Sequence, residues 1–425
     1  MKYRLLALAA LLSAVLPSCG QRQLSDDELL DEIEQATIRY FTDFADPETG
    51  LARERSNDRN GNIVTIGGSG FGMMAVIAGA ERGYYTKAEG IERIGRMVES
   101  LERLPRFHGA WAHWYDADTW KPFSFSEFDD GADLVETAFM VQGLIAARQW
   151  LSEKDFPLAE RCHELWMGVE WDWFTRGTDS LYWHWSPRYE WKMNHRISGY
   201  DETLITYILA ASSPSYPITR ECYEASYKTS SYYYNGKDYY GITLPLGMEL
   251  GGPLFFCHYS YLGLDPRGLH DGYCDYFERN RAHTLIHRAY AMDNPKGHPG
   301  YGEDLWGFTS SDDPDVGYSS HHPGTPSDNG TVSPTAAVSS IVYTPQESMA
   351  VIRHLYYDTD MFGPYGFYDA YNPGRDPAVV DHYLAIDQGP EAVMIENYRS
   401  GLLWDLFMSA PEIAKGLEKL GFYYQ

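Results

Sequence analysis

The chain has 425 residues, a formal charge of −26 and 44% hydrophobic residues. The apolar content is enough for a large core, which excludes a wholly disordered chain, and the length allows one large domain or two of ordinary size. An acidic chain without a Lys/Arg cluster is repelled by phosphate backbones and anionic lipid surfaces. Composition therefore argues against nucleic-acid binding.

The N-terminus is typical of an export signal and is set apart from the fold. Met1-Lys-Tyr-Arg4 is basic, and the apolar run from Leu5 to Leu16 is too short to span a bilayer comfortably. The following Pro-Ser-Cys-Gly resembles a bacterial lipobox, which predicts a lipoprotein signal over residues 1–19 with lipid on Cys19. An ordinary secretory signal is the alternative. In both cases we expect an exported protein, periplasmic or attached to a bacterial membrane by the lipid alone, with residues 20–25 as a tether.

The remaining residues, 26–425, are predicted to form one helical domain. Capping boxes at Ser25/Glu28 and Thr86/Glu89 mark two helix starts. Helices are expected at 26–44, 71–82, 86–104, 133–151, 157–175, 200–212, 219–228, 253–263, 271–293, 335–342, 345–357, 376–385, 389–408 and 410–420. Short β structure is expected only near 181–185 and 232–244.

Several of these helices are too apolar to lie at a surface, notably 71–80, 134–147, 203–211 and 391–408. A double-layered ring would bury some helices completely and leave the others amphipathic. An α/α toroid and a helical solenoid both fit this pattern. A solenoid should show a sequence repeat, and the sequence shows none, so the toroid is favoured.

Four carboxylates within residues 129–136 lead into an almost wholly apolar helix. If that helix begins by Asp129, then Asp129, Asp133 and Glu136 share one face. Carboxylates grouped against an apolar wall have their pKa values pushed apart, which suits acid/base chemistry. The alternative is a capping box, with Asp133 as N-cap and Glu136 three residues later. Capping is the favoured role for Asp130 and Asp133.

Two further carboxylates stand beside apolar runs. Glu202 lies at the start of the helix expected over 200–212, where a functional role and a helix-dipole role are equally open. Glu396 interrupts an apolar stretch and needs a partner, which Arg399 at i+3 could supply. Glu391, one turn earlier, is expected to be exposed.

Aromatic residues make up 15% of the chain and gather in the segments between helices. An aromatic ring with a polar edge suits a pyranose, whose C–H face stacks while its hydroxyl groups need partners. Core packing is the alternative for about half of them. Ring-rich loops beside acidic groups indicate a cleft. The candidate substrate-contacting residues are Trp111, Trp191, His258, Trp306, Phe308 and Tyr368.

Other chemistry finds little support in the sequence. The chain has no Gly-x-Ser-x-Gly, no His-Glu-x-x-His and no phosphate loop. The spacings of Cys162, Cys222, Cys257 and Cys274 match no metal motif, and disulfides or buried thiols are equally open. We therefore expect no metal and no cofactor.

Taken together, the motifs resemble glycoside hydrolase family 144, the β-1,2-glucan-degrading enzymes of the glucoamylase-like (glycoamylase) group. The resemblance spans roughly residues 30–420. The matching segments are 129–144, 202–210 with Ser213-Pro214, 252–255 with 258–260, 304–308, 330–337, 366–372, 387–390 and 395–398. Two departures concern the specificity for substrate: residues 258–261 lack a Gln and a second His of related domains, and Glu391 replaces an apolar residue.

The resemblance implies an (α/α)6 barrel that hydrolyses β-1,2-glucosidic bonds without a metal. It places the acid and base among Asp129, Asp133, Glu136 and Glu202, with Glu396 as a further candidate. Our hypothesis is that Glu202 is the acid and that Asp133 and Glu136 supply or position the base. The alternatives are a non-catalytic glycan-binding lipoprotein and a toroid enzyme, such as a lyase, acting on another polysaccharide. Endo or exo action and the stereochemical course stay open.

Overall fold

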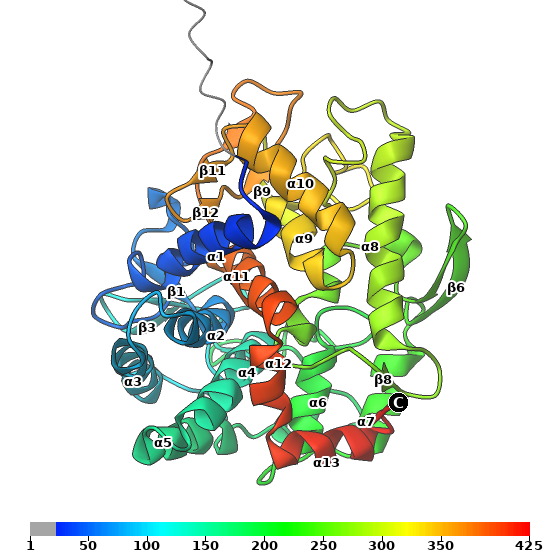
Figure 1. The fold of residues 1–425 in the computed structure, drawn as a ribbon. Coiled ribbons are helices and arrows are strands. Elements are labelled where there is room, and N and C mark those ends of the chain that lie inside the picture. Colours follow the sequence, from blue (N-terminus) through cyan, green and yellow to red (C-terminus); the bar gives the residue numbers. More distant parts are fainter. Residues whose placement is uncertain (1–22) are drawn as a thin grey trace, which may run out of the picture.

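A computed structural model describes residues 23–425 (Figure 1). The predicted signal, with Cys19, and the first residues of the tether lie outside this range. The helices are α1 (Asp26–Thr42), α2 (Ile66–Arg82), α3 (Lys87–Arg103), α4 (Leu134–Leu151), α5 (Phe156–Met167), α6 (Leu204–Ser212), α7 (Arg220–Ala225), α8 (Tyr276–Asp293), α9 (Pro334–Ser339), α10 (Pro345–Asp358), α11 (Ala385–Arg399), α12 (Leu402–Met408) and α13 (Pro411–Leu420). Short 3-10 turns include η5 (Leu254–Cys257), η6 (Tyr259–Tyr261) and η7 (Ser340–Val342).

The helices form the predicted double-layered ring. The inner layer consists in chain order of α2, α4, α6, the η5–η6 segment, α9 and α11, and the outer layer of α1, α3, α5, α7, α8 and α10. Contacts between α11 and α2 close the inner ring. Every residue of α6 is buried, as are nearly all of α4, because both helices are apolar on every face. The prediction of an (α/α)6 toroid is confirmed.

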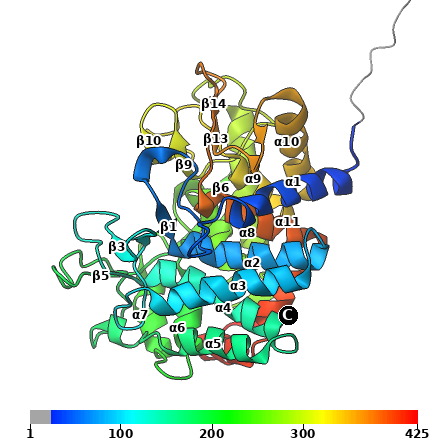
Figure 2. The same ribbon diagram turned by 90° about the vertical axis from the view of Figure 1, so that its left-hand side faces the viewer.

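The strands are short and lie in the connections between helices. They are β1 (Ile63–Thr65), β2 (Trp114–Asp116), β3 (Lys121–Phe123), β4 (Ala132–Asp133), β5 (His184–Trp185), β6 (Tyr234–Tyr239), β7 (Ile242–Leu246), β8 (Leu269–His270), β9 (Ser310–Asp313), β10 (Gly317–Ser320), β11 (Phe362–Gly363), β12 (Gly366–Phe367), β13 (Ala370–Tyr371), β14 (Val379–Val380) and β15 (Tyr423–Tyr424). All pairings are antiparallel, and β1, β2 and β3 form a three-stranded sheet. Figure 2 shows β1, β3, β5 and β10 together at one side of the helical ring.

Both predicted capping boxes are present, at Ser25/Glu28 and at Thr86/Glu89. The helix expected from residue 71 begins earlier, at Ile66, and the glycine-rich stretch before residue 71 forms the first turns of α2. Its glycines allow α2 to cross α4 closely: a Cβ on Gly70 would lie 2.4 Å from the backbone oxygen of Phe139, and a Cβ on Gly143 would lie 2.4 Å from the backbone oxygen of Gly70.

Other helix predictions were wrong as well, and the helix expected over 157–175 already ends at Met167, as α5. Residues 376–385 contain β14 and extended chain rather than a helix, and 253–263 forms 3-10 turns. The helix predicted over 389–408 is divided into α11 and α12 by Gly401, whose φ of 77° is left-handed and ends helical geometry there.

The described part of the chain holds four free cysteines, so the disulfide alternative is not realised: they are Cys162, Cys222, Cys257 and Cys274. No helix between residues 23 and 425 combines the length and apolar character that a membrane crossing requires.

Candidate active site

A cavity of about 350 Å³ opens where the loops meet the starts of the inner helices. Its wall comes from six parts of the ring, so residues far apart in sequence meet there. The lining residues are Glu54, Arg55, Thr65, His113, Trp114, Phe125, Glu136, Phe139, Trp183, Glu202, Phe255, Tyr259, Tyr318, Leu384 and Ile386. Its volume lies near the lower end of the range of about 300–1,000 Å³ typical of ligand sites.

Glu136, in the first turn of α4, reaches the cavity wall. Its Oε2 accepts a hydrogen bond of 2.8 Å from the backbone N–H of Gly67, at the start of α2. Burial raises the pKa of Glu136 to about 7; the positive charge of His113 opposes the rise, and the neighbouring Asp133 adds to it. A carboxyl with this pKa can exchange a proton near neutral pH.

Asp133 is the N-cap of α4, as the capping alternative predicts. Its Oδ1 accepts hydrogen bonds from the backbone N–H groups of Val135 and Glu136, at 3.0 and 2.9 Å, and from Trp183 Nε1 at 2.9 Å. Its Oδ2 accepts one of 2.8 Å from His113 Nδ1. Burial alone would raise the pKa of Asp133, but the hydrogen bond from His113 and the charges nearby hold it below its ordinary value. Asp133 is thus a buried carboxylate behind the cavity wall.

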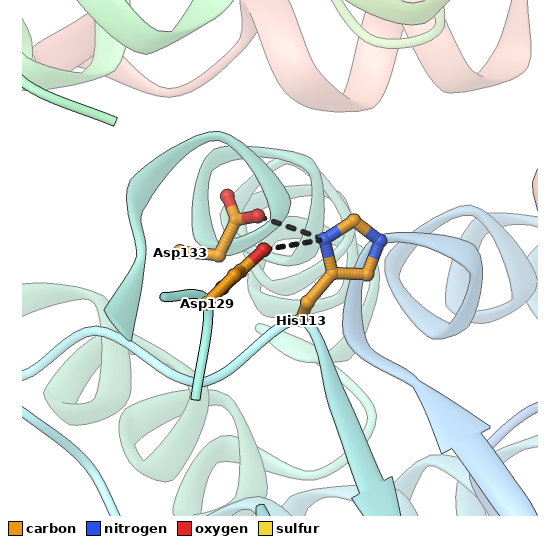
Figure 3. A group of neighbouring side chains, drawn as sticks. All are labelled: His113, Asp129 and Asp133. Atoms are coloured by element: carbon orange, nitrogen blue, oxygen red, sulfur yellow. Dashed lines mark hydrogen bonds and ion pairs between the residues drawn. The ribbon is translucent and has the colours of Figure 1, made fainter. Parts of the chain in front are cut away.

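Asp129 reaches the same cluster from a loop, because α4 begins at Leu134 and the expected helical face over 129–136 does not form. Figure 3 shows Asp129 and Asp133 converging on the same ring nitrogen of His113. Asp129 is 2% exposed, and among the described residues neither carboxylate oxygen has a hydrogen-bond partner. Two imidazole nitrogens lie within 4 Å of its Oδ2: His184 Nδ1 at 3.4 Å and His113 Nδ1 at 3.9 Å.

His113, Asp129 and Asp133 offer three atoms within 4.8 Å of one another, close enough to surround a metal ion. His113 Nδ1, however, already donates its proton to Asp133. Burial would lower the pKa of His113, but Glu136, Asp133 and Asp129 together raise it to about 10. An imidazolium among carboxylates balances charge without an ion, and we interpret the cluster as an ion-pair network.

Glu202 lies in the turn just before α6 and lines the cavity. Its backbone oxygen accepts a hydrogen bond of 2.5 Å from Ser260 in η6, which ties this turn to the next inner segment. Burial raises the pKa of Glu202 well above its ordinary range, and the adjacent Asp201 adds to the effect. Burial therefore favours the protonated form of Glu202, the form required of a general acid.

Glu396 does not reach the cavity. It is buried between helices and pairs with Arg82 of α2 at 2.5 Å, while Arg399 pairs instead with Glu34 of α1. The structure thus corrects both the prediction of a catalytic Glu396 and the partner expected for it. Glu391, expected to be exposed, is 1% exposed.

The predicted substrate-contacting residues also need correction. None of the six lines the cavity. Trp111, His258, Trp306 and Phe308 are fully buried in the core. Trp191 packs against Trp173, with ring centroids 4.8 Å apart, and Tyr368 stacks on Tyr383 at 4.9 Å. A high aromatic content does not reveal which rings face inwards.

Some of the rings that do line the cavity, such as Trp114 and Trp183, come from the aromatic segments between helices. The sequence did not identify His113, Glu54 or Arg55. Arg55 is held by Glu54 at 2.6 Å and by Asp312 at 2.5 Å, so its guanidinium is fixed at the wall. His113 lies in an aromatic segment between α3 and α4, and the pairing of β1 with β2 brings that segment close to α2.

Comparisons with known proteins agree with this architecture. Residues 194–411 match the glycoamylase family, described as "Putative glucoamylase". A Bacteroides uniformis structure with the same description is 52% identical, covering 95% of this chain and 99% of that one, with a TM-score of 0.92. An endo-β-1,2-glucanase from Chitinophaga pinensis, solved with sophorotriose and glucose, is 48% identical over 94% of this chain and 99% of that one, also with a TM-score of 0.92.

A further relative is an exo β-1,2-glucooligosaccharide sophorohydrolase (non-reducing end) from Parabacteroides distasonis. It is 42% identical over 422 residues, which cover 93% of this chain. The chain spans 58% of the length of that relative. The matched region and the near-complete structural overlap lead to one conclusion: the chain belongs to the glycoamylase family.

Proposed function

We propose that this protein is a glycoside hydrolase that cleaves β-1,2-glucosidic bonds in β-1,2-glucan or its oligosaccharides. The observation that carries the proposal is a pair of carboxyl groups, Glu202 and Glu136, on one aromatic-lined cavity. Burial raises the pKa of Glu202 well above its ordinary range and that of Glu136 to about 7. Two carboxyl groups with different pKa values provide the acid and the base of glycoside hydrolysis. The activities named for the Chitinophaga and Parabacteroides relatives support the choice of glucan.

In the proposed reaction, protonated Glu202 donates its proton to the glycosidic oxygen as the bond to the anomeric carbon breaks. Ionised Glu136 is the second carboxylate. It either bonds to the anomeric carbon itself, in an intermediate that water then hydrolyses, or takes a proton from a water molecule whose oxygen forms the new bond to that carbon. Asp133 positions Glu136 by capping the helix turn that carries it. Trp114, Trp183 and other cavity rings offer apolar faces to the pyranose C–H groups.

The pH dependence follows from these two groups. Glu136 must be ionised, so activity rises with pH through about 7, the pKa to which burial raises it. Glu202 must keep its proton, so activity falls again at the higher pH where Glu202 ionises. The profile of kcat/KM is therefore expected to be bell-shaped, with its acidic limb near neutrality.

The test is the release of oligosaccharides from linear β-1,2-glucan. Glu202→Gln should lower kcat by about 10²- to 10⁴-fold, the usual contribution of a general acid, without loss of folding. Glu396→Gln is the matched control, because that buried carboxyl lies away from the cavity. Unchanged cleavage by the Glu202 variant would refute its role. Binding of the glucan without cleavage by the unaltered protein would identify a glycan-binding protein instead, and a time course of product lengths separates endo from exo action.

We also propose that the mature protein is an exported monomer held at a bacterial membrane by lipid on Cys19. The basic and apolar residues before Cys19 support export. Cys19→Ala should move the protein from the detergent phase to the aqueous phase in a partition experiment. Detergent partitioning that does not change with Cys19 would contradict the lipid anchor, and light scattering of the soluble variant reports its oligomeric state.

A further inference from the structure

His113 lines the cavity and also contacts the buried carboxylates Asp129 and Asp133. Its Nδ1 donates to Asp133 Oδ2 at 2.8 Å and lies 3.9 Å from Asp129 Oδ2. Its Nε2 lies 3.9 Å from Glu136 Oε1. That distance is too long for a hydrogen bond but short enough for a strong charge interaction. One ring therefore connects the two buried aspartates to the cavity carboxyl.

The backbone fixes this ring relative to Glu136. The carbonyl oxygen of His113 accepts a hydrogen bond of 3.1 Å from Ile66 N–H, and the next residue of α2, Gly67, donates to Glu136. On the other side, Phe125 stacks on the imidazole with centroids 4.3 Å apart and planes 20° apart. The His113 side chain is only 19% exposed. The ring is held between an aromatic cover and a carboxylate, so it has little freedom to turn away.

We propose that His113 is a positioning residue for the hydrolysis, whose imidazolium, fixed by Asp133, keeps Glu136 ionised and so sets the lowest pH at which the enzyme is active. This inference rests on the proposed function. Without that positive charge, Glu136 would stand beside Asp133 and Asp129 in a buried site and would hold its proton to higher pH.

The charged groups around the ring support this assignment. Asp129, Asp133 and Glu136 each have a carboxylate oxygen within 4 Å of a ring nitrogen of His113. The Nδ1 atom of His184 lies 3.4 and 3.7 Å from the Oδ2 atoms of the two aspartates. Across the cavity stand Glu202, Tyr259 and Tyr318, and also Glu54 with Arg55, whose guanidinium is already paired with carboxylates. His113 is therefore the positively charged side chain of the cavity wall that lies next to Glu136, with its Nε2 at 3.9 Å from Glu136 Oε1.

The experiment separates the charge of His113 from its hydrogen bond. In His113→Asn the amide nitrogen takes the place of Nδ1 and can still donate to Asp133, but the positive charge is gone. We expect the acidic limb of the kcat/KM profile to move up by about 1 pH unit or more, with activity approaching that of the unaltered enzyme at high pH. His108→Asn is the matched control: His108 pairs with Glu170 at 2.9 Å away from the cavity, and its φ of 50° suits asparagine.

An acidic limb that stays in place in a folded His113→Asn variant would overturn the proposal, as would a loss of activity that is equal at every pH. A second measurement does not depend on activity. The ring nitrogens of His113, assigned by NMR from the difference between the unaltered and variant proteins, should both carry protons at pH 8. A neutral ring at that pH would refute the proposal even if the variant did not fold. An unaltered protein that releases nothing from β-1,2-glucan would refute the proposed function, while the NMR result would still decide the state of His113.

Discussion

Gly67→Ala tests whether the position of Glu136 matters, because the three atoms nearest to a Cβ added at Gly67 all belong to that carboxyl group. A Cβ on Gly67 would lie 2.5 Å from Glu136 Oε2 and 2.9 Å from its Cδ. To reach ordinary contact the carboxylate must retreat by about 0.9 Å, and a displacement of about 1 Å at a catalytic group costs about 100-fold in rate. We expect kcat to fall by about 10- to 100-fold, which corresponds to about 1.4–2.7 kcal/mol in the activation free energy.

The fold should survive, since alanine is more favourable than glycine inside a helix by about 0.5–1 kcal/mol. Gly72→Ala is the control in the same helix, because the three atoms nearest to its Cβ all belong to the ring of Phe41, the closest at the same 2.5 Å. Initial rates of oligosaccharide release and thermal unfolding are measured for both variants. If the Gly67 variant is folded and fully active, the hydrogen bond from Gly67 does not position a catalytic base, and the assignment of Glu136 fails.

Two further predictions concern the core. Trp111→Ala should lower the free energy of unfolding by about 3–5 kcal/mol, the usual cost of removing a buried Trp, and leave KM unchanged. Trp183→Ala, at the cavity, should raise KM. Denaturant unfolding and steady-state kinetics measure both effects, and an altered KM in the Trp111 variant would show that Trp111 contacts the substrate. Burial, with Glu396 adding to it, raises the pKa of Glu34 to about 8. Because this exceeds the unfolded value, the stabilisation is complete below about pH 4.5 and is lost as pH rises through about 8. Glu34→Gln should therefore flatten the fall of unfolding free energy between pH 5 and 9, and an equally steep fall in the variant would contradict the buried proton.

The features of the fold that could be predicted are those that depend on residues close together in the sequence. A capping box needs only four residues, and both predicted boxes are present. The uniform apolarity of α4 and α6 was enough to assign them to an inner layer. The start of α2 was missed because its glycines serve a partner helix far along the chain, where Gly70 meets Gly143. Local sequence marks these glycines as loop residues, and only the crossing of α2 and α4 explains them.

The same distinction applies to the site. Glu136 and Glu202, which both line the cavity, were predicted as candidates because an acidic residue beside an apolar helix stands out in the local sequence. Glu396 gave the same signal, but its partner Arg82 is 314 residues away along the chain and makes it part of a structural ion pair. His113 gave no local signal of its own beyond its place in an aromatic segment. Its place depends on the pairing of Thr65 with Trp114, which brings two separate loops together.

Asp133 was predicted either as a helix cap or as part of the site, and in the folded protein it has both roles. Oδ1 satisfies the first N–H groups of α4, and Oδ2 accepts the proton of His113. One of those N–H groups belongs to Glu136, so the cap holds the backbone of the proposed base while Gly67 holds its carboxylate. The start of an inner helix needs an acceptor there in any case. In this protein the acceptor is the buried carboxylate of Asp133, and only its Oδ1 is used to cap the helix. Its Oδ2 is free to accept the proton of His113, so the residue that caps α4 also holds the positive charge of His113 beside the cavity.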